Sequence, residues 1–472
     1  MTSHLDCIIR GGTVVSDDSV ARLDVGIADG QIAALSESLS AQGAREIDAG
    51  GCVVIPGAVD VHTHFANTLG AHGQTADDYW SGTRAAAAGG ITTVINYAFQ
   101  ERGESLANTV ERERGRANGS SLIDYGFHVG VTDITDSPAL GEFARLGDEG
   151  ITSVKVFTTV EIFRLSDRDL LRVLEQARTD QLLVNIHAED DALIEHLTEK
   201  QLKSAPDDIR SLALSRPDEA EALAVERSAT YARAVGCPIY IVHVSSAAAL
   251  RVIRRARRAG GAVYAEARPA YLFLDESCYD LPAQQGRRYA SIPPLRPLSD
   301  QRALWRALVR GEIQTYATDH TTWKLSTKTD PTLNFAEVPG GIPDVQTSVG
   351  MLFSEGVSRR RMPLLQFAKA CSTNPAKIFG LWPRKGRLAV GSDADIVVLD
   401  PALEMRLDDL ETESQCDYLP YAGYVSKGWP VLTMSRGEVI CERGRITGEK
   451  GRGRFLVRGR HTSAGMMEAG IG

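Results

Sequence analysis

Cysteine is scarce and irregularly placed in this chain of 472 residues. Its seven cysteines stand at positions 7, 52, 237, 278, 371, 416 and 441, and no two of them form a CxxC pair. An odd number of scattered cysteines argues against a disulfide framework and against a zinc-thiolate cluster. The pattern predicts reduced thiols and a cytoplasmic protein.

The chain also lacks an excess of basic charge and long apolar runs. Its 52 lysines and arginines face 61 aspartates and glutamates, which gives a net charge of −9. Proteins that bind nucleic acids usually carry the opposite sign on their working face, so we expect no nucleic-acid partner. Gly, Asp or Arg interrupts the longest apolar stretches well before the roughly 20 residues of a membrane span. The N-terminal MTSHLDCIIRGG has neither a basic start nor an apolar core, so we expect neither a signal peptide nor a membrane span.

The middle of the chain, residues 53–384, alternates between apolar β-type runs and segments of helical composition. We count eight such runs: VVIPGAVDVH, ITTVINYAF, IDYGFHVGV, ITSVKVF, LLVNIHA, IYIVHVS, AVYAEA and IQTYATD. Helical periodicity lies between most of them, as in DRDLLRVLEQARTD and EAEALAVERSATYARAV. Eight β-then-α units predict an α/β protein built on a (β/α)8 TIM-type barrel with parallel strands.

The two ends of the chain have a different pattern. Residues 1–52 hold short β-branched pieces bounded by Gly and Asp, and strand signals return in residues 385–446, for example ADIVVLD. We expect these two zones to pair into a small β-sandwich domain beside the barrel. Residues 447–472 are rich in Gly and Arg and lack periodicity, which predicts a tail that is disordered or docked on a neighbouring subunit.

Histidines and one carboxylate stand at the ends of the predicted barrel strands. The first run ends in DVHTH, and because residues two apart on a strand point the same way, His62 and His64 can reach one metal ion. The fifth run ends in His187, the sixth in His243 and the eighth in Asp319. Active sites of such barrels form at the C-terminal ends of the strands. Since the chain has only ten histidines, four at strand ends favour a metal site over chance.

Lys155 lies inside the fourth apolar run, SVKVF. Burying a lysine costs several kcal/mol unless the side chain is paired or modified. An ion pair with Glu161 or Asp319 is the structural alternative to a modification. Each of the other residues has such an alternative too, because His187 or His243 alone is often a hydrogen-bonded core histidine and Asp319 alone can cap a helix. Their joint placement favours a functional site.

These residues and the segments between them resemble the cyclic amidohydrolases, the group of dihydropyrimidinases, hydantoinases, allantoinases and dihydroorotases. The similarity extends over nearly the whole chain and is strongest, outside the ligand positions, in PGAVDVHTH, GGITTVINY, IVHVSSAAAL, IPPLRP, CSTNPAKIFGL and KGRLAVGSDADIVVLD. The segment CDYLPYAGYVSKGWPVLTMSRGEVI is most similar to hydantoinases and dihydropyrimidinases. The resemblance implies the TIM-type barrel of the amidohydrolase superfamily.

The resemblance also implies a ligand set. In that family the strand lysine is carbamylated by CO2, and this modification falls on Lys155. His62, His64 and Asp319 would hold one divalent ion, His187 and His243 the other, and carbamylated Lys155 would bridge the two. Histidine nitrogens suit zinc. Two such ions would make hydroxide from a bridging water at neutral pH, and Asp319 would act as general base and then as general acid while a ring amide is opened.

The chain departs from the family pattern at three positions. Val160 stands where many hydantoinases and dihydropyrimidinases have a tyrosine that donates to the developing oxyanion, so Thr158, Thr159, another tyrosine or the metal ions must replace it. Gly340 stands where an asparagine is often found, and Ile292 where a serine is common. Family contacts at 292 and 340 are largely through the backbone, so we expect Ile292 and Gly340 to contact the substrate. We expect Thr159 to contact it as a replacement for the tyrosine.

These observations predict a hydrolase that opens a hydantoin or a dihydropyrimidine, with a small cyclic amide as its partner. Allantoinase is an alternative within the class, favoured by the segment GGIPDVQ. A non-catalytic scaffold member of the family is a third possibility, but scaffolds lose ligands and this chain keeps all six positions. The resemblance and the apolar FLV at 455–457 predict a homotetramer.

Overall fold

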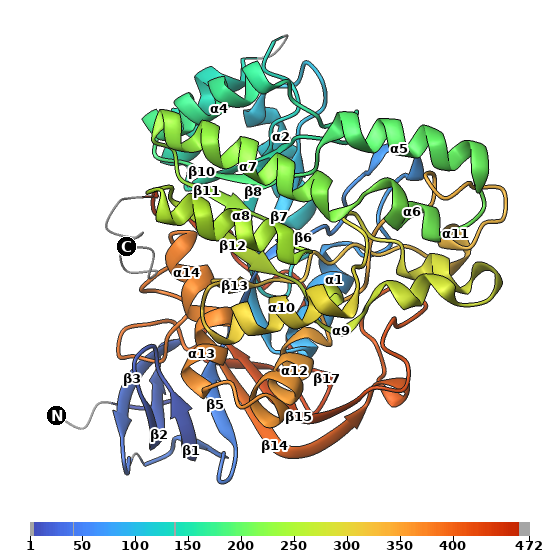
Figure 1. The fold of residues 1–472 in the computed structure, drawn as a ribbon. Helices are drawn as coiled ribbons and strands as arrows, with labels where there is room; N and C mark the ends of the chain where they lie inside the picture. The colour runs from blue at the N-terminus through green and yellow to red at the C-terminus, as the bar shows by residue number, and fades with distance from the viewer. Residues whose placement is uncertain (1–3, 41, 136–137, 462–472) are drawn as a thin grey trace.

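An eight-stranded parallel barrel forms the centre of the molecule. The computed structural model describes residues 4–40, 42–135 and 138–461, and Figure 1 shows the barrel with its helices above a second sheet. Its strands follow the order β13-β12-β11-β10-β9-β8-β7-β6, and each of the eight predicted runs contains one of them. A bridge between Thr63 and His320 joins the two edges. The barrel strands are β6 (Ala58–Thr63), β7 (Ile91–Phe99), β8 (Asp124–Gly130), β9 (Ser153–Phe157), β10 (Leu183–His187), β11 (Ile239–Ile241), β12 (Val263–Ala267) and β13 (Thr315–Tyr316).

Burial on both faces explains why the barrel strands are almost uniformly apolar. Every residue of β9 and β10 is buried, including Lys155 and His187. In a parallel sheet, helices cover the outer face and side chains fill the interior, so an alternating polar pattern is not needed. The polar residues that do occur in these strands therefore need a specific reason.

Helices follow the strands and cover the outside of the barrel. Ser105, Ser166 and Ser246 each accept a backbone N–H at a helix start, which fixes where these helices begin. The α-helices are α1 (Tyr79–Ala88), α2 (Leu106–Ala117), α3 (Phe143–Asp148), α4 (Asp167–Thr179), α5 (Asp191–Ser204), α6 (Arg210–Ser215), α7 (Asp218–Val235), α8 (Ala247–Arg258), α9 (Pro269–Phe273), α10 (Leu298–Val309), α11 (Leu325–Lys328), α12 (Ser348–Leu352), α13 (Leu364–Ala368) and α14 (Asn374–Ile378).

Seven further helical elements occur within the described residues. Two of them are π-helical and continue α12 and α13, and the other five are short 3-10 helices. They are η1 (Gly70–His72), η2 (Ala139–Glu142), η3 (Glu276–Asp280), η4 (Ala283–Tyr289), η5 (Phe353–Arg359), η6 (Lys369–Thr373) and η7 (Leu407–Asp409). Within the described residues, no helix combines the length and the apolar character that crossing a membrane requires.

Both chain ends build the second sheet, as expected. Eight of its nine strands follow one hydrogen-bonded path, β17-β16-β15-β14-β5-β1-β2-β3, and β4 pairs with β1 beside that path. It contains parallel and antiparallel pairs, so we call it the mixed sheet. Figure 1 shows it in blue and red below the barrel. The strands are β1 (Cys7–Val15), β2 (Val20–Ala28), β3 (Gln31–Ser36), β4 (Arg45–Asp48), β5 (Val53–Pro56), β14 (Ile396–Arg406), β15 (Val425–Ser435), β16 (Glu438–Glu442) and β17 (Arg445–Ile446).

The first predicted barrel run is divided between the two sheets. Its first part, β5, pairs with β14 and β1 in the mixed sheet, and only β6 enters the barrel. Gly57 separates them, and a Cβ added there would lie 2.1 Å from Thr92 Oγ1. The sheet-to-barrel transition therefore falls at Gly57, not before Val53 as the continuous apolar run indicates.

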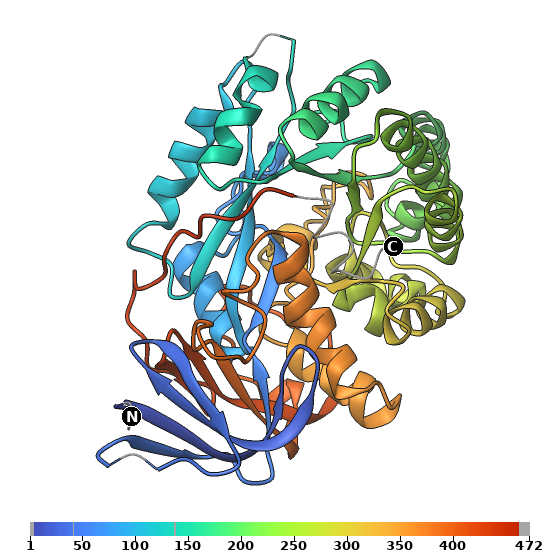
Figure 2. The same cartoon turned by 90° about the vertical axis from the view of Figure 1, so that its left-hand side faces the viewer.

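The described part of the tail packs on the barrel of its own chain. Arg454 O accepts the backbone N–H of Tyr125 at 2.9 Å, and Leu456 N donates to Tyr125 O at 2.8 Å. Arg458 is buried and donates to Ser153 Oγ and to Phe127 O. Figure 2 shows this red segment running beside the barrel strands. Residues 454–458 are therefore packed on the barrel and do not form a disordered tail, while 462–472 lie outside the described residues.

Candidate metal centre and active site

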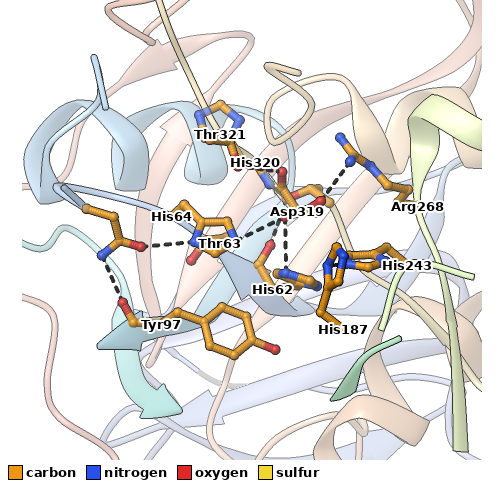
Figure 3. A network of polar contacts seen from close by, with 12 residues as sticks. His62, Thr63, His64, Tyr97, His187, His243, Arg268, Asp319, His320 and Thr321 are labelled. Carbon is orange, nitrogen blue, oxygen red and sulfur yellow. Dashed lines mark hydrogen bonds and ion pairs between the residues drawn. The ribbon is translucent and has the colours of Figure 1, made fainter. Parts of the chain in front are cut away.

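His62, His64 and Asp319 meet at one end of the barrel. His62 is the penultimate residue of β6, His64 follows that strand, and Asp319 lies just after β13. Both Nε2 atoms face the same oxygen of Asp319, with His62 at 3.1 Å and His64 at 3.0 Å from Oδ1 (Figure 3). The three ligand atoms lie within 4.8 Å of one another, and all three side chains are buried. This is a geometry that a divalent ion can use.

The other ring nitrogen of each histidine is held by the protein. His62 Nδ1 lies 2.7 Å from Glu266 Oε1, and His64 Nδ1 lies 3.0 Å from Asn67 Oδ1. Since both partners are acceptors, each Nδ1 donates to its partner. Acceptors placed in this way orient histidine ligands in metal sites.

His187 and His243 form a second pair beside the first. His187 Nδ1 lies 2.9 Å from His243 Nε2, and His187 Nε2 lies 2.8 Å from Glu189 Oε2. The His62 and His243 ring centroids are 5.6 Å apart, so the two groups of histidines adjoin. Glu266 Oε1 also accepts the backbone N–H of His243 at 2.8 Å. One carboxylate oxygen therefore contacts both groups.

Lys155 points into the same region without an acidic partner. Its side chain is 1% exposed, and within the described residues no hydrogen bond or ion pair holds its Nζ. The rings of Tyr97 and Phe157 lie beside the amine, with centroids 4.9 and 5.0 Å from Nζ. Burial lowers the pKa of Lys155 to about 7, against the attraction of Asp319 and Glu266. The ion pair with Glu161 or Asp319 that the sequence left open is not formed.

The chemistry of these residues fits two divalent ions and a modified lysine. Imidazole nitrogens and a carboxylate are the ligands that zinc and similar ions prefer. Burial would raise the pKa of Asp319, but the positive charges of His62 and Arg268 hold it well below its usual range, so the carboxylate is ionised. An unpaired amine with a pKa near 7 is available to react with CO2.

The backbone is strained at two of these positions. His243 and Asp319 have φ angles of 37° and 52°, in the left-handed region that residues other than glycine rarely adopt. Such conformations cost of order 1–3 kcal/mol each and cluster at functional sites. Here they turn both side chains toward the end of the barrel.

A single cavity of about 540 Å3 contains the six predicted ligands in its wall. Its size is within the usual range for small-molecule sites. We call the six predicted ligands the cavity-floor residues. Much of the remaining wall is apolar. The apolar and aromatic residues of the wall are Leu69, Phe99, Phe157, Val160, Ile162, Phe163, Ile292, Trp323, Ala336 and Val338.

The predicted substrate contacts are only partly brought together. Ile292 and Gly340 line the cavity and face each other, since a Cβ on Gly340 would lie 3.1 Å from Ile292 Cγ1. Thr159 is not in the wall, because its hydroxyl donates to Asp191 Oδ1 at 2.8 Å. Thr158 likewise donates to Glu189 O at 2.7 Å. Val160 does line the cavity, with a φ of 69°.

Comparison with known proteins places the chain in a family. The model of the Amidohydrolase family matches residues 53–440. The chain belongs to the Amidohydrolase family. It is 40% identical over 456 residues to a D-hydantoinase of Ralstonia pickettii, covering 96% of this chain and 99% of that protein. It is 39% identical over 458 residues to a D-hydantoinase of Geobacillus stearothermophilus, covering 96% and 97%. The structure of a dihydropyrimidinase from Brevibacillus agri superimposes with a TM-score of 0.93 at 36% identity, covering 96% and 99%.

Sequence reasoning missed three charged residues of this amidohydrolase site. Glu189 accepts from His187, and Glu266 accepts from His62. Arg268 donates to Asp319 Oδ2 at 2.7 Å. Two signals were available: Glu266 interrupts the apolar run AVYAEA, and Arg268 follows two residues later. A charged residue at the end of a buried strand is the same signal that pointed to His187.

Proposed function

We propose that this chain is a metal-dependent cyclic amidohydrolase that opens the ring of a hydantoin or a dihydropyrimidine. The main support is that six side chains, from five barrel strands or the ends of those strands, line one cavity of suitable size. The D-hydantoinase relatives, similar over almost the whole chain, support the substrate class. Ring-amide hydrolysis is the chemistry that this combination favours.

In this proposal each of the six cavity-floor residues has a defined role. His62, His64 and Asp319 would hold one divalent ion, His187 and His243 would hold another, and carbamylated Lys155 would supply an anionic ligand to both. The ions, with zinc favoured by the histidine nitrogens, supply a water activated at neutral pH and polarise the ring carbonyl when bound. The carbamate replaces a cation by an anion, which removes the cost of keeping an unpaired ammonium group in a buried site.

Asp319 moves the proton. Its Oδ1 faces His62 and His64, while Oδ2 lies on the other side of the carboxylate. The low pKa keeps Asp319 ionised at neutral pH, so that it is ready to accept a proton. It takes the proton of the attacking water and delivers it to the departing ring nitrogen, acting first as base and then as acid.

The apolar wall selects the substituent on the ring. Phe163 lies close to two other aromatic rings, with centroids 4.8 Å from Phe99 and 5.0 Å from Phe157. Such a cluster suits an apolar or aryl substituent, because each buried methylene contributes about 0.8 kcal/mol. We propose that the backbone groups of Ile292 and Gly340 hold the ring, and we leave Thr159 out of the site. Hydantoins substituted at carbon 5 are then the preferred substrates.

A substrate panel tests this function. The purified protein, expressed with added zinc or manganese, is assayed with 5-phenylhydantoin, hydantoin, dihydrouracil, allantoin and dihydroorotate. We expect the 5-substituted hydantoin to give the highest kcat/KM. A preference for allantoin would favour the allantoinase alternative, and no turnover of any ring by a metal-loaded protein would favour a scaffold.

A variant of Asp319 connects the activity to this site. Asp319→Asn is expected to lower kcat by about 10²- to 10⁴-fold, the usual contribution of a positioned acid or base. Asp18→Asn, in an exposed turn of the mixed sheet, is the matched control and should not change kcat. Near-normal kcat in an Asp319→Asn protein that holds both ions would remove Asp319 from the mechanism.

We also propose that the protein is a cytoplasmic homotetramer. All seven cysteines lie in the described part of the chain, and each is a free thiol, which suits a reducing compartment. Phe455 and Leu456 pack on the barrel, but Val457, Leu214 and Leu223 remain 69%, 52% and 52% exposed and are available for subunit contacts. Light scattering at micromolar concentration should give four times the 51.1 kDa chain mass, and a monomer mass would contradict the proposal.

A further inference from the structure

Arg268 is a buried cation that the mechanism above does not use. It follows β12 at the start of α9, lines the cavity and is 1% exposed. Its Nη1 donates to Asp319 Oδ2 at 2.7 Å and to Ser291 Oγ at 3.1 Å. A charged hydrogen bond between two buried groups is among the stronger polar contacts in proteins.

This contact divides the two oxygens of Asp319 between different partners. Oδ1 faces the histidines of β6, and Oδ2 faces the guanidinium (Figure 3). A free carboxylate can rotate about its χ2 bond and offer both oxygens to one ion. With Oδ2 held by Arg268, that rotation breaks a charged hydrogen bond.

A second carboxylate and an aromatic ring also lie near the guanidinium. Its Nη2 lies 3.6 Å from Asp344 Oδ2, and the ring of Tyr271 lies 5.3 Å from its Cζ. The other oxygen of Asp344 accepts from the hydroxyl of Tyr421. Arg268 therefore lies between two carboxylates, one in the candidate metal centre and one held away from it.

We infer that Arg268 is a positioning residue for Asp319. By holding Oδ2, it makes Asp319 offer the single oxygen Oδ1 to the ion at His62 and His64. It also keeps Oδ2 at the cavity wall, where that oxygen can take a proton. This inference rests on the proposed function, because it concerns how Asp319 serves the ion and the proton transfer.

Two variants of Arg268 separate positioning from mere packing. Arg268→Met keeps much of the side-chain volume and removes the donors, and Arg268→Lys keeps the charge with a simpler geometry. The matched control is Arg257→Met, which removes a half-buried arginine that binds Val263 O and Gln314 outside the cavity wall. Each protein is loaded with Co2+ and measured for metal content, visible absorption, kcat and KM.

For Arg268→Met we expect two ions per chain, a changed Co2+ absorption spectrum, and a kcat that is about 10- to 100-fold lower with little change in KM. Arg268→Lys should recover most of the spectrum and lose less than about 10-fold in kcat. The control should keep the wild-type spectrum and kcat.

Two results would overturn the inference. One is an Arg268→Met protein with the wild-type spectrum and kcat. The other is loss of both ions in the Met and the Lys variants alike, which would make Arg268 a packing residue. A wild-type protein that binds no second ion and opens no ring would instead overturn the proposed function. That result comes from the wild-type protein alone and is therefore distinct from a failure of the inference about Arg268.

Discussion

Two buried lysines in this molecule have nearly opposite surroundings. Lys155 in the candidate metal centre and Lys385 at the junction of barrel and mixed sheet are each 1% exposed. Lys155 Nζ lies beside the rings of Tyr97 and Phe157 and, within the described residues, has no carboxylate partner. Lys385 Nζ lies 2.7 Å from Asp124, 2.6 Å from Asp395 and 2.9 Å from Asp393.

The pKa values follow these surroundings. Burial alone lowers the pKa of both amines, and for Lys155 it brings the value to about 7. The three aspartates around Lys385 reverse the effect and raise its pKa above the usual range. Lys385 thus stays a cation and connects β8 to the segment before β14, whereas Lys155 is easily converted to a neutral amine.

The comparison teaches how to distinguish a structural from a functional buried lysine. Lys155 and Lys385 are equally buried, so burial alone does not show whether a lysine has a structural or a functional role. The number of carboxylates within hydrogen-bond distance separates the two sites. Lys328 is also buried without a carboxylate partner, but its Nζ donates to Ala290 O at 2.9 Å and to Gly341 O at 2.6 Å. Within the described residues, Lys155 differs from both lysines because its Nζ has neither a carboxylate nor a carbonyl partner.

The largest expected effect is at Lys155. Lys155→Ala should lose the second ion and most activity, a loss larger than the about 10²- to 10⁴-fold of a positioned acid or base, since the bridging group has no substitute nearby. A short-chain carboxylic acid should restore part of it by replacing the carbamate. Elemental analysis and kcat measure both effects, and a Lys155→Ala protein with two ions and normal turnover would break the comparison.

Lys385→Met should affect stability instead of chemistry. It leaves three buried aspartates without their cation, and removing one partner of a buried ion pair typically costs about 3–5 kcal/mol. Chemical denaturation should show this loss in the free energy of unfolding. The metal-loaded folded fraction should keep the wild-type kcat, and a lower kcat at full metal content would mean that the junction also serves the active site.

The two lysines should also differ in their reaction with CO2. At constant dissolved CO2, the initial rate of Lys155 carbamylation in the metal-free protein should rise with pH with a midpoint near pH 7, because only the neutral amine reacts and its pKa is about 7. The neutral fraction rises from about a tenth at pH 6 to about nine tenths at pH 8. Carbon-13 NMR with labelled bicarbonate follows the carbamate. Lys385 should give no signal in this range, and a signal that persists in Lys155→Ala would contradict the assignment.

The smallest effect concerns Val160, five residues after Lys155. Val160→Tyr should narrow the cavity and shift kcat/KM toward dihydrouracil and away from a 5-aryl hydantoin, by about 0.8 kcal/mol for each methylene excluded. Val160→Gly is the control for the loop, since it relieves the φ of 69° without adding volume. A wild-type preference for dihydrouracil that Val160→Tyr leaves unchanged would refute this interpretation.

The sequence predicted the positions of the six cavity-floor residues because a barrel brings all strand ends to one place. His187 and His243 needed only the assumption of parallel strands to become neighbours. The partners of these residues were not predictable in the same way. Glu266 contacts His62 across the barrel, and no local pattern connects two side chains on strands so distant in sequence.

Two further features could not be predicted from the sequence, for related reasons. The run from Val53 to His62 is continuously apolar because both of its halves are buried, so periodicity did not reveal that they enter different sheets. The tail has no helical or strand period, because isolated backbone hydrogen bonds to Tyr125 and Gly150 and side-chain contacts hold it in place of a regular element. Arg458, which binds Ser153 and Phe127, is a single residue in a Gly- and Arg-rich segment of ordinary appearance.

The pairing of β5 with β14 sets a time order for folding on the ribosome. Pro56 pairs with Ile396, about 340 residues later. At about 5–20 residues per second, roughly 17 to 70 s separate the synthesis of these two partners. During that interval β5 has an unpaired edge, and exposed strand edges of this kind aggregate readily. The N-terminal strands are therefore synthesised first, but their sheet is completed only when β14 has been made. Expression at lower temperature or with added chaperones should therefore raise the yield of folded protein.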